Sequence, residues 1–359
     1  MLLNDECKNC FNKNINRNKN KILLLLSVFL FSSCASVPSA DAPAWAVDME
    51  AEFPFDKFLA QKGKGKNVSE AEAAAGRALA QYFQVNIIVE AREEAVSRGN
   101  NPTEITNIES TIRQVNIDLF AYQYTKSWYN QKERLYEIAA FINRDEAWKI
   151  FEPGVRREEA SFLDMYNAAQ SENGGLKRFI MLRGTQNYYN VNFAPLRSFA
   201  EKLHPVKARE SFPDTDNALR GLPRLIDGAR LQSAIFIDCK EDFENRISQT
   251  IESMLNNEGF RVTKNRAEAT AVFSIDFNFN MTENTGSDMR AFNFTPSVQA
   301  VLTEKNEVIF SYRAPTQSRT ITVTQDAGRR RSAAALVTAM EETFPVEFKQ
   351  NMASFAERK

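Results

Sequence analysis

The sequence predicts an α+β protein with two small α/β sandwich-like domains, in which helices pack on mixed or antiparallel sheets, joined by a helical hairpin. Three observations support this prediction. The chain has 359 residues, a length that suits two domains and a connector. Apolar residues recur at helical spacing in some segments and alternate with polar residues at strand spacing in others. A content of 43% hydrophobic and 25% charged residues is ordinary for a globular protein.

The first domain is predicted over residues 45–153. Ser69 and Glu72 have the spacing of a capping box, which predicts a helix that begins near Ser69. An apolar stripe repeats every four residues within this helix, at Ala71, Ala75, Leu79 and Phe83. Apolar and polar residues then alternate over residues 85–90, which predicts a strand.

A hairpin is predicted at the end of this domain. One apolar and aromatic run ends at Tyr129, and a second covers residues 135–142. The polar residues between the two runs are typical of a turn. A short helix over residues 145–151 is expected to close the domain.

A helical connector is predicted over residues 155–204 and a linker over residues 205–230. Apolar side chains stand at helical spacing in the connector, at Phe162, Met165, Tyr166 and Ala169. Gly174 and Gly175 interrupt the pattern, which predicts a helical hairpin or a short bundle. Prolines with Asp and Gly residues then indicate the linker.

The second domain is predicted over residues 231–355 and begins with a strand at 231–237. A helix follows, with one apolar face formed by Phe243, Ile247, Ile251, Met254 and Leu255. Gly259 stands where a left-handed helix cap is expected. Further strands are predicted over residues 260–263, 271–279, 298–302, 308–312 and 320–324. A last helix carries apolar residues from Leu336 to Phe355, and Pro345 is expected to kink or restart it.

The N-terminus has the pattern of an export signal over residues 1–33. Basic side chains precede an apolar stretch from Ile22 to Phe31, which is about half the length of a membrane-spanning helix. Ser32, Ser33 and Cys34 resemble a lipobox, in which a cysteine thiol accepts a diacylglyceryl group; Phe31 departs from the usual Leu. A plain secretory signal with Cys34 incidental is the alternative.

The lipobox resemblance implies two or three acyl chains, palmitate among them, on Cys34, and chains in this number anchor a protein stably. Residues 34–44 are small and Pro-containing, as a tether should be. Ala35 follows the cysteine in place of an Asp retention signal. We therefore expect an outer-membrane anchor with the protein on the periplasmic face.

The cysteines exclude a disulfide framework in the mature chain. Cys7 and Cys10 are removed with the signal, and Cys34 takes the lipid. Cys239 then has no partner within the chain. It follows an apolar run over residues 234–237, so a buried thiol is expected, with an intermolecular bridge as the alternative.

The first domain contains several short motifs: Pro43-Ala44-Trp45, Gly63-x-Gly65, a helix that starts Ser69-Glu70-Ala71, and Trp128-Tyr129 followed by the strand-like run at 135–142. By these motifs it resembles the twenty-kilodalton outer-membrane lipoprotein family, which is related to flagellar assembly lipoproteins. This resemblance covers roughly a third of the chain and implies a small α/β fold in the envelope, without catalytic residues. The order of elements after Leu231 resembles the amino-terminal domain of TolB, by topology alone.

No residue pattern predicts catalysis or a cofactor. His204 is the single histidine and is expected on the surface, so a histidine-centred zinc site or a catalytic triad is poorly supported. Gly63 and Gly65 predict a tight turn, because Val68 replaces the third glycine of a phosphate-binding loop. The paired carboxylates Glu158-Glu159 and Glu341-Glu342 are expected to be solvated.

Arg329, Arg330 and Arg331 form the sharpest charge run and are placed just before the last helix. They are either simply solvated or contact an anionic partner such as peptidoglycan or a lipid head group. The 45 basic and 46 acidic residues of the whole chain give no global field for nucleic acid.

These patterns predict a non-enzymatic envelope lipoprotein with no cofactor and no metal. The first hypothesis is a module that binds or assembles envelope proteins, in motility or in envelope maintenance, with the membrane held through acyl chains on Cys34. The second is an accessory lipoprotein that binds peptidoglycan or another glycan. A cell-wall hydrolase is the third.

Overall fold

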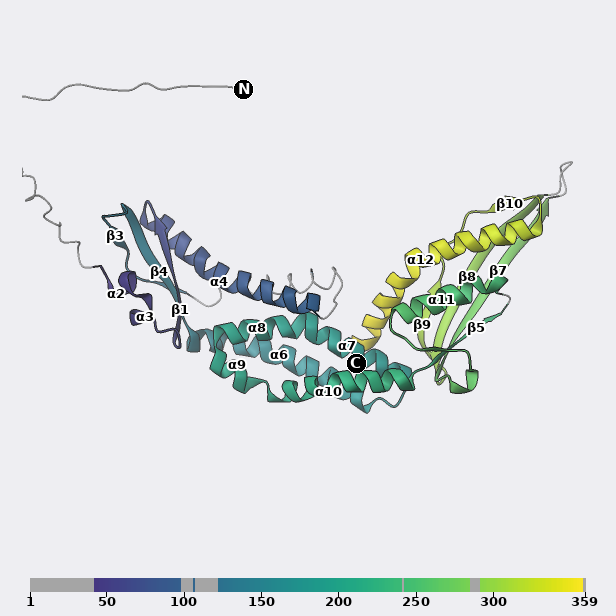
Figure 1. The fold of residues 1–359 in the computed structure, drawn as a ribbon, viewed down its shortest axis with the longest axis horizontal. Coiled ribbons are helices and arrows are strands. Elements are labelled where there is room, and N and C mark those ends of the chain that lie inside the picture. The colour runs from purple at the N-terminus through teal and green to yellow at the C-terminus, as the bar shows by residue number, and fades with distance from the viewer. Residues whose placement is uncertain (1–41, 98–105, 107–121, 241, 285–290, 358–359) are drawn as a thin grey trace, which may run out of the picture.

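The computed structural model describes residues 42–97, 106, 122–240, 242–284 and 291–357. Three parts follow one another along the longest axis of the molecule (Figure 1). A four-stranded sheet comes first along the described chain, a helical segment follows, and a six-stranded sheet lies at the other end. The protein is therefore α+β, as predicted.

The first sheet, sheet A, is antiparallel and has β4 at its centre. Its strands are β1 (Phe58–Gly65), β2 (Gln123–Tyr124), β3 (Trp128–Asn130) and β4 (Leu135–Asn143). The other three strands all pair with β4, and β3 and β4 form the predicted hairpin. The long helix α4 (Val68–Ser97) contacts β1 and β4. A smaller apolar cluster around Trp45 and Phe53 includes residues of the short helices α2 (Ala44–Val47) and α3 (Met49–Glu52).

Helix α4 corrects two predictions. The strand predicted over residues 85–90 is wrong, because α4 continues to Ser97 without a proline to interrupt it. The helix cap lies two residues earlier than predicted, at Asn67, with Glu70 in the first turn. Glu70 N–H donates to Asn67 Oδ1 at 2.9 Å, and Glu70 Oε2 accepts from Lys66 N–H at 2.9 Å.

Gly63 and Gly65 lie in strand β1, so the tight turn predicted for them is wrong. Their role is to let α4 lie directly on the strand. A Cβ atom on Gly63 would lie 2.1 Å from the backbone nitrogen of Ala75, and one on Gly65 would lie 2.4 Å from that of Ala71. Both distances are far inside van der Waals contact, so only glycine fits at these positions.

We expect Gly63→Ala to lower the free energy of unfolding by about 1–3 kcal/mol, because helix α4 must move away from β1. Gly228→Ala is the matched control in helix α10 (Pro213–Gln232), where an added Cβ meets no atom within 4 Å. That substitution should stabilise the protein by about 0.5–1 kcal/mol. Chemical denaturation measures both, and a loss of stability of the same size in both variants would contradict the packing described.

The helical segment is larger than the predicted hairpin. It consists of α6 (Arg144–Ser171), α7 (Gly175–Tyr188), a π-helical turn η2 (Tyr189–Phe193), α8 (Ala194–Leu203), α9 (Pro205–Ser211) and α10. The break before Gly175 is confirmed. The predicted closing helix at 145–151 is only the start of α6, which continues through Pro153.

The linker predicted over residues 205–230 is wrong, because α9 and α10 occupy it. Pro205 and Pro213 stand in the first turns of these helices, where a backbone N–H has no intrahelical acceptor to lose. Pro223 lies inside α10. The prolines therefore mark helix starts at two of the three positions that had suggested an irregular linker.

The second sheet, sheet B, is mixed and has β7 and β8 at its centre. Its strands are β5 (Ile235–Lys240), β6 (Val262–Thr263), β7 (Ala271–Asn284), β8 (Ala291–Glu304), β9 (Glu307–Arg313) and β10 (Thr320–Thr322). Strand β5 is parallel to β6 and β7, and the other pairs are antiparallel. The start predicted for β5 at 231 is wrong, because α10 continues to Gln232.

Helices α11 (Arg246–Asn257) and α12 (Gln325–Glu357) cover one face of sheet B (Figure 1). The predicted face of α11 is confirmed from Ile247 onward, but Phe243 precedes the helix in the short turn η3 (Phe243–Asn245). Gly259 has φ 81°, as expected for a left-handed cap. Pro345 lies inside α12, which continues beyond it to Glu357.

The alternation predicted in β7 is confirmed. Phe273, Ile275 and Phe277 are buried on the helix side, whereas Asp276 is exposed on the other face. The ring of Phe273 meets that of Phe344 of α12 edge to face, with centroids 6.0 Å apart. Sheet B therefore has one buried face and one face without a covering helix among the described residues.

Candidate functional site

Arg329, Arg330 and Arg331 lie in the second turn of α12 and not before the helix as predicted, because α12 already begins at Gln325. All three are exposed. The flanking residues Gly328 and Ser332 are buried against the sheet. Consecutive helical residues differ by about 100° in direction, so the three arginines point to three different parts of the solvent side.

The start of α12 is held by close packing on sheet B. A Cβ on Gly328 would lie 2.0 Å from the ring of Phe294 and 2.7 Å from Thr322 Oγ1. Thr322 Oγ1 donates to the carbonyl of Thr324 at 2.7 Å, in the turn that joins β10 to α12. The backbone that carries the arginines is thus fixed against the sheet.

One carboxylate forms an ion pair with this run of arginines. Glu244 in η3 forms an ion pair with Arg330 Nε at 3.2 Å through one oxygen and with Arg246 Nη2 at 3.0 Å through the other. Arg329 and Arg331 make no ion pair with any residue that the structure describes. We call Arg246, Arg329, Arg330 and Arg331 the basic tip. Glu244 pairs with two of its four guanidinium groups, and Asp326 is exposed one helical turn before Arg329 and Arg330. The positive charges of the tip therefore outnumber these two negative ones.

Two aliphatic side chains adjoin the basic tip in the chain. Ile321 in β10 is 54% exposed, and Val323, at the turn into α12, is 67% exposed. Strand β10 contacts α12 at this end of the molecule (Figure 1). Thr322 faces α12, so Ile321 points from the opposite face of sheet B. This end combines positive charge with exposed aliphatic surface.

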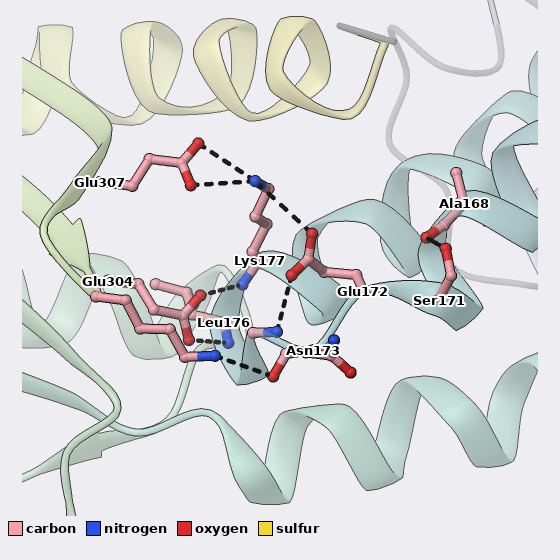
Figure 2. A network of polar contacts seen from close by, with 10 residues as sticks. Ala168, Ser171, Glu172, Asn173, Leu176, Lys177, Glu304 and Glu307 are labelled. Carbon is pink, nitrogen blue, oxygen red and sulfur yellow. Dashed lines mark hydrogen bonds and ion pairs between the residues drawn. The ribbon is translucent and has the colours of Figure 1, made fainter.

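The joint between the helical segment and sheet B is made by Glu304 at the end of β8 (Figure 2). Its side chain accepts from the backbone N–H groups of Leu176 and Lys177, both at 2.9 Å. These groups belong to the first turn of α7, where a carboxylate is favoured by unpaired donors and by the helix dipole. Glu304 is only 4% exposed, so the contact is shielded from water.

Further charged contacts surround this joint (Figure 2). Lys177 Nζ lies 3.1 Å from Glu307 Oε2 and 3.7 Å from Glu172 Oε2. The hydrogen bond that Lys177 donates to the Glu307 carboxylate raises the pKa of Lys177 above its ordinary value, so this amine stays charged. Lys305 Nζ donates to the carbonyl of Asn173 at 3.4 Å. The α7 start is therefore held to the β8–β9 turn at several points.

A buried arginine makes the joint between the helical segment and sheet A. Arg144, the first residue of α6, is 1% exposed. Its Nε donates to the carbonyl of Phe55 at 2.7 Å, and its Nη1 donates to those of Lys202 and Leu203 at 2.7 and 2.5 Å. Burial lowers the pKa of Arg144 from its ordinary value. The side chain thus links the chain before β1 to the C-terminus of α8.

Cys34 lies outside the described residues. Two other candidate residues, His204 and Glu159, have structural roles. The prediction of a surface His204 is wrong, because it is buried, caps α9, and its Nε2 lies 3.3 Å from Asp145 Oδ1. Glu159 is also buried and accepts from Thr215 Oγ1 at 2.9 Å, so the prediction of a solvated carboxylate is wrong there. Glu341 and Glu342 are exposed, as expected.

The described residues contain neither a metal-binding cluster nor a helix suited to spanning a membrane. No three His, Cys, Asp or Glu side chains in those residues are grouped to hold a metal ion. In the same ranges, no helix combines the length and the apolar character that a membrane span needs.

Cys239 is a free, half-buried thiol in β5. Burial is the largest cause that raises the pKa of this thiol to about 12, and the nearby carboxylates of Asp242, Asp238 and Asp276 raise it further toward that value. The thiol therefore stays protonated throughout the physiological range, and only the thiolate is nucleophilic.

We expect iodoacetamide at about pH 8 to alkylate Cys239 on the order of 1,000-fold more slowly in the folded mature chain than in the chain unfolded by urea. The folded rate should rise about tenfold for each pH unit up to the raised pKa. Mass spectrometry of quenched samples measures the rate. Equal rates in the folded and unfolded chains would contradict the burial of this thiol.

Comparison with known proteins finds no matching family model and no matching curated protein. Several solved structures match at low similarity. The secreted protein HP1454 from Helicobacter pylori is 10% identical with a TM-score of 0.34, and the match covers 79% of this chain and 98% of that one. A minor lipoprotein from Acinetobacter baumannii is 8% identical with a TM-score of 0.23, over 36% of this chain and 96% of that one.

A third match is the uncharacterized lipoprotein B from Nitrosomonas europaea, 13% identical with a TM-score of 0.19, over 34% of this chain and 82% of that one. Two of these proteins are lipoproteins and one is secreted. TM-scores this low carry over neither a family nor a function. The resemblance to the twenty-kilodalton lipoprotein family stays a prediction.

Proposed function

We propose that this chain is a lipid-anchored envelope protein without catalytic activity, which acts as a rigid spacer and binding module for assembly in the envelope. The helical segment holds sheet B and the basic tip at the end of the molecule opposite to α2 (Figure 1). The observation that carries this proposal is the pair of buried polar joints, made by Arg144 and Glu304, at the two ends of the helical segment.

Apolar cores support the rigidity at both joints. Phe179 of α7 and Leu222 of α10 belong to the same core as Phe273 of sheet B. Phe199 of α8 belongs to the core of sheet A, where its ring stacks on that of Phe83 with centroids 5.0 Å apart. Domains joined by flexible linkers share little buried surface and move independently. Shared cores favour a single body instead.

The proposed anchor is the acylated Cys34. The tether from residue 34 to residue 44 can extend by at most about 3.5 Å per residue, so it keeps α2 and sheet A close to the anchoring membrane. Sheet B then projects away from that membrane or along it. A spacer of this form suits a protein that places a binding surface at a fixed distance from its anchor.

The anchor is tested by Cys34→Ala in cells supplied with a fatty-acid probe. We expect the label to be lost and the protein to leave the membrane fraction, because one thiol accepts the lipid. Cys239→Ala is the matched control and should keep the label. A fully labelled Cys34→Ala variant would refute the proposed anchor.

A second candidate function, glycan binding, is favoured by the uncovered face of sheet B. Asn278 pairs with Ser297 and Asn280 with Thr295 across β7 and β8, and these uncharged polar side chains point away from α11 and α12. Asn is disfavoured in strands, so its repeated use on this face is unexpected for packing alone. Co-sedimentation with purified peptidoglycan, lost in Asn278→Ala/Asn280→Ala, would favour this candidate over the first.

A further inference from the structure

We propose that the Asn173-Gly174 pair is a deamidation site, which Glu172 protects in the folded chain and whose conversion to isoaspartate loosens the joint made by Glu304. This inference rests on the proposed function, because that joint holds sheet B to the helical segment. Three features carry it: the Asn-Gly sequence, the packing of Gly174 on the joint, and a carboxylate on the reacting nitrogen (Figure 2).

Asparagine followed by glycine deamidates readily, because glycine has no side chain to keep its backbone nitrogen away from the asparagine amide. Asn173-Gly174 is the only Asn-Gly pair in the sequence. In the reaction, the Gly174 nitrogen gives up its proton and bonds to Asn173 Cγ, while the side-chain nitrogen takes up a proton and leaves as ammonia. Water then opens the cyclic imide at either carbonyl, which yields aspartate or isoaspartate.

The joint requires glycine at position 174. A Cβ atom there would lie 2.7 Å from Glu304 Oε2, the oxygen that accepts from the N–H of Lys177. Gly174 is buried, and its carbonyl accepts from Arg178 N–H at 2.9 Å in the first turn of α7. Asn173 is exposed, and its side chain makes no hydrogen bond with any residue that the structure describes. The close packing of the joint therefore leaves a reactive pair at its edge.

Glu172 opposes the first step of this reaction. Its Oε1 accepts from the Gly174 N–H at 2.9 Å, so the nitrogen that must lose a proton is held beside a negative charge (Figure 2). Both the hydrogen bond and the charge favour the protonated nitrogen. Lys305 Nζ donates to the Asn173 carbonyl at 3.4 Å, which restrains the rotation that brings Cγ to this nitrogen. The folded joint thus slows its own modification.

Isoaspartate is expected to loosen the joint because it lengthens the backbone. The main chain of isoaspartate passes through Cγ, so an extra methylene group precedes Gly174. Gly174 then cannot keep its contacts with Glu172, Glu304 and Arg178 at the same time. Aspartate, the other product, leaves the length of the backbone unchanged. The two products should therefore differ in their effect on the joint.

The protection is tested by incubating the purified mature chain in mildly alkaline buffer and measuring conversion at Asn173 by mass spectrometry. We expect slow conversion in the folded chain and faster conversion in guanidinium chloride. Glu172→Ala should speed conversion in the folded chain by about tenfold, the factor expected for a hydrogen bond to a charged group. Glu172→Gln, which keeps an acceptor oxygen without the charge, should convert at an intermediate rate.

Glu307→Ala is the matched control for these rates. It removes the other carboxylate that pairs with Lys177 and leaves the bond from Gly174 to Glu172 in place. Its conversion rate should equal that of the unsubstituted chain, and thermal melts verify that each variant is folded. An unchanged rate in Glu172→Ala, or an equal acceleration in Glu172→Ala and Glu307→Ala, would overturn the proposed protection.

The loosening is tested with spin labels at Ala73→Cys on α4 and Ala335→Cys on α12, in a Glu172→Ala/Cys239→Ser chain before and after ageing. An isoaspartate-specific methyltransferase measures the content of that product. We expect the distance distribution to broaden as isoaspartate accumulates, and to stay narrow in Asn173→Asp. A narrow distribution at high isoaspartate content would overturn the loosening. A distribution that is already broad in the unaged, Glu172-containing chain refutes the spacer instead, and the conversion rates decide the protection separately.

Discussion

Replacing Arg144 by methionine is expected to lower the free energy of unfolding by about 3 kcal/mol or more. The substitution keeps most of the apolar stem and removes the guanidinium. The carbonyls of Phe55, Lys202 and Leu203 then lose their donor at a buried joint. Each buried polar group left without a partner costs about 1–3 kcal/mol. Chemical denaturation followed by circular dichroism measures the change.

Arg157→Met is the matched control for this prediction. Arg157 lies on the same helix, but its side chain is 78% exposed and makes only a long contact of 3.7 Å with Glu158. We expect a change within about 0.5 kcal/mol for it. Similar stability of the two variants would show that the Arg144 joint contributes little and that sheet A is not held to the helical segment in this way.

Replacing Phe273 by alanine is expected to lower stability by about 3–5 kcal/mol, a large part of the 5–15 kcal/mol typical of a domain. Its ring is fully buried at the centre of sheet B, between Phe310 and Phe344. The cavity left behind would be lined by aromatic rings that cannot collapse without moving α12. A thermal melt of sheet B, followed by near-ultraviolet circular dichroism, reports this loss.

Asp276→Ala provides the comparison on the same strand. Asp276 lies three residues further along β7 and is exposed on the opposite face. Its truncation removes no packing, so the melting temperature should change little. Equal effects of the two substitutions would mean that both faces of β7 are buried, contrary to the fold described.

Elements with strong local patterns could be predicted from the sequence. The unbroken alternation from Ala271 to Phe279 and the apolar face of α11 were predicted with the correct type and orientation. The strand predicted at 85–90 failed because a short alternation of apolar residues occurs by chance within a long helix. The helix starts at Pro205 and Pro213 were taken for a linker, because proline is common both in linkers and in the first turn of a helix.

The joints could not be predicted because their partners are distant in the sequence. Arg144 contacts carbonyls 58 and 59 residues away, and Glu304 contacts N–H groups 127 and 128 residues away. Backbone groups carry no residue-specific signal, so no pattern in the chain indicates these bonds. For the basic tip, the arginine run was visible in the sequence, whereas Arg246 and Glu244 join it only through the fold.

The rigidity of the whole body is tested most directly by a distance between sheet A and sheet B. Spin labels are placed at Ala73→Cys on α4 and Ala335→Cys on α12, two exposed helix positions, in a Cys239→Ser chain that starts at Ala35. We expect one narrow distance distribution, which Glu304→Ala broadens by releasing α7 from β8. A broad or multiple distribution before that substitution would show independently moving domains and contradict the proposed spacer.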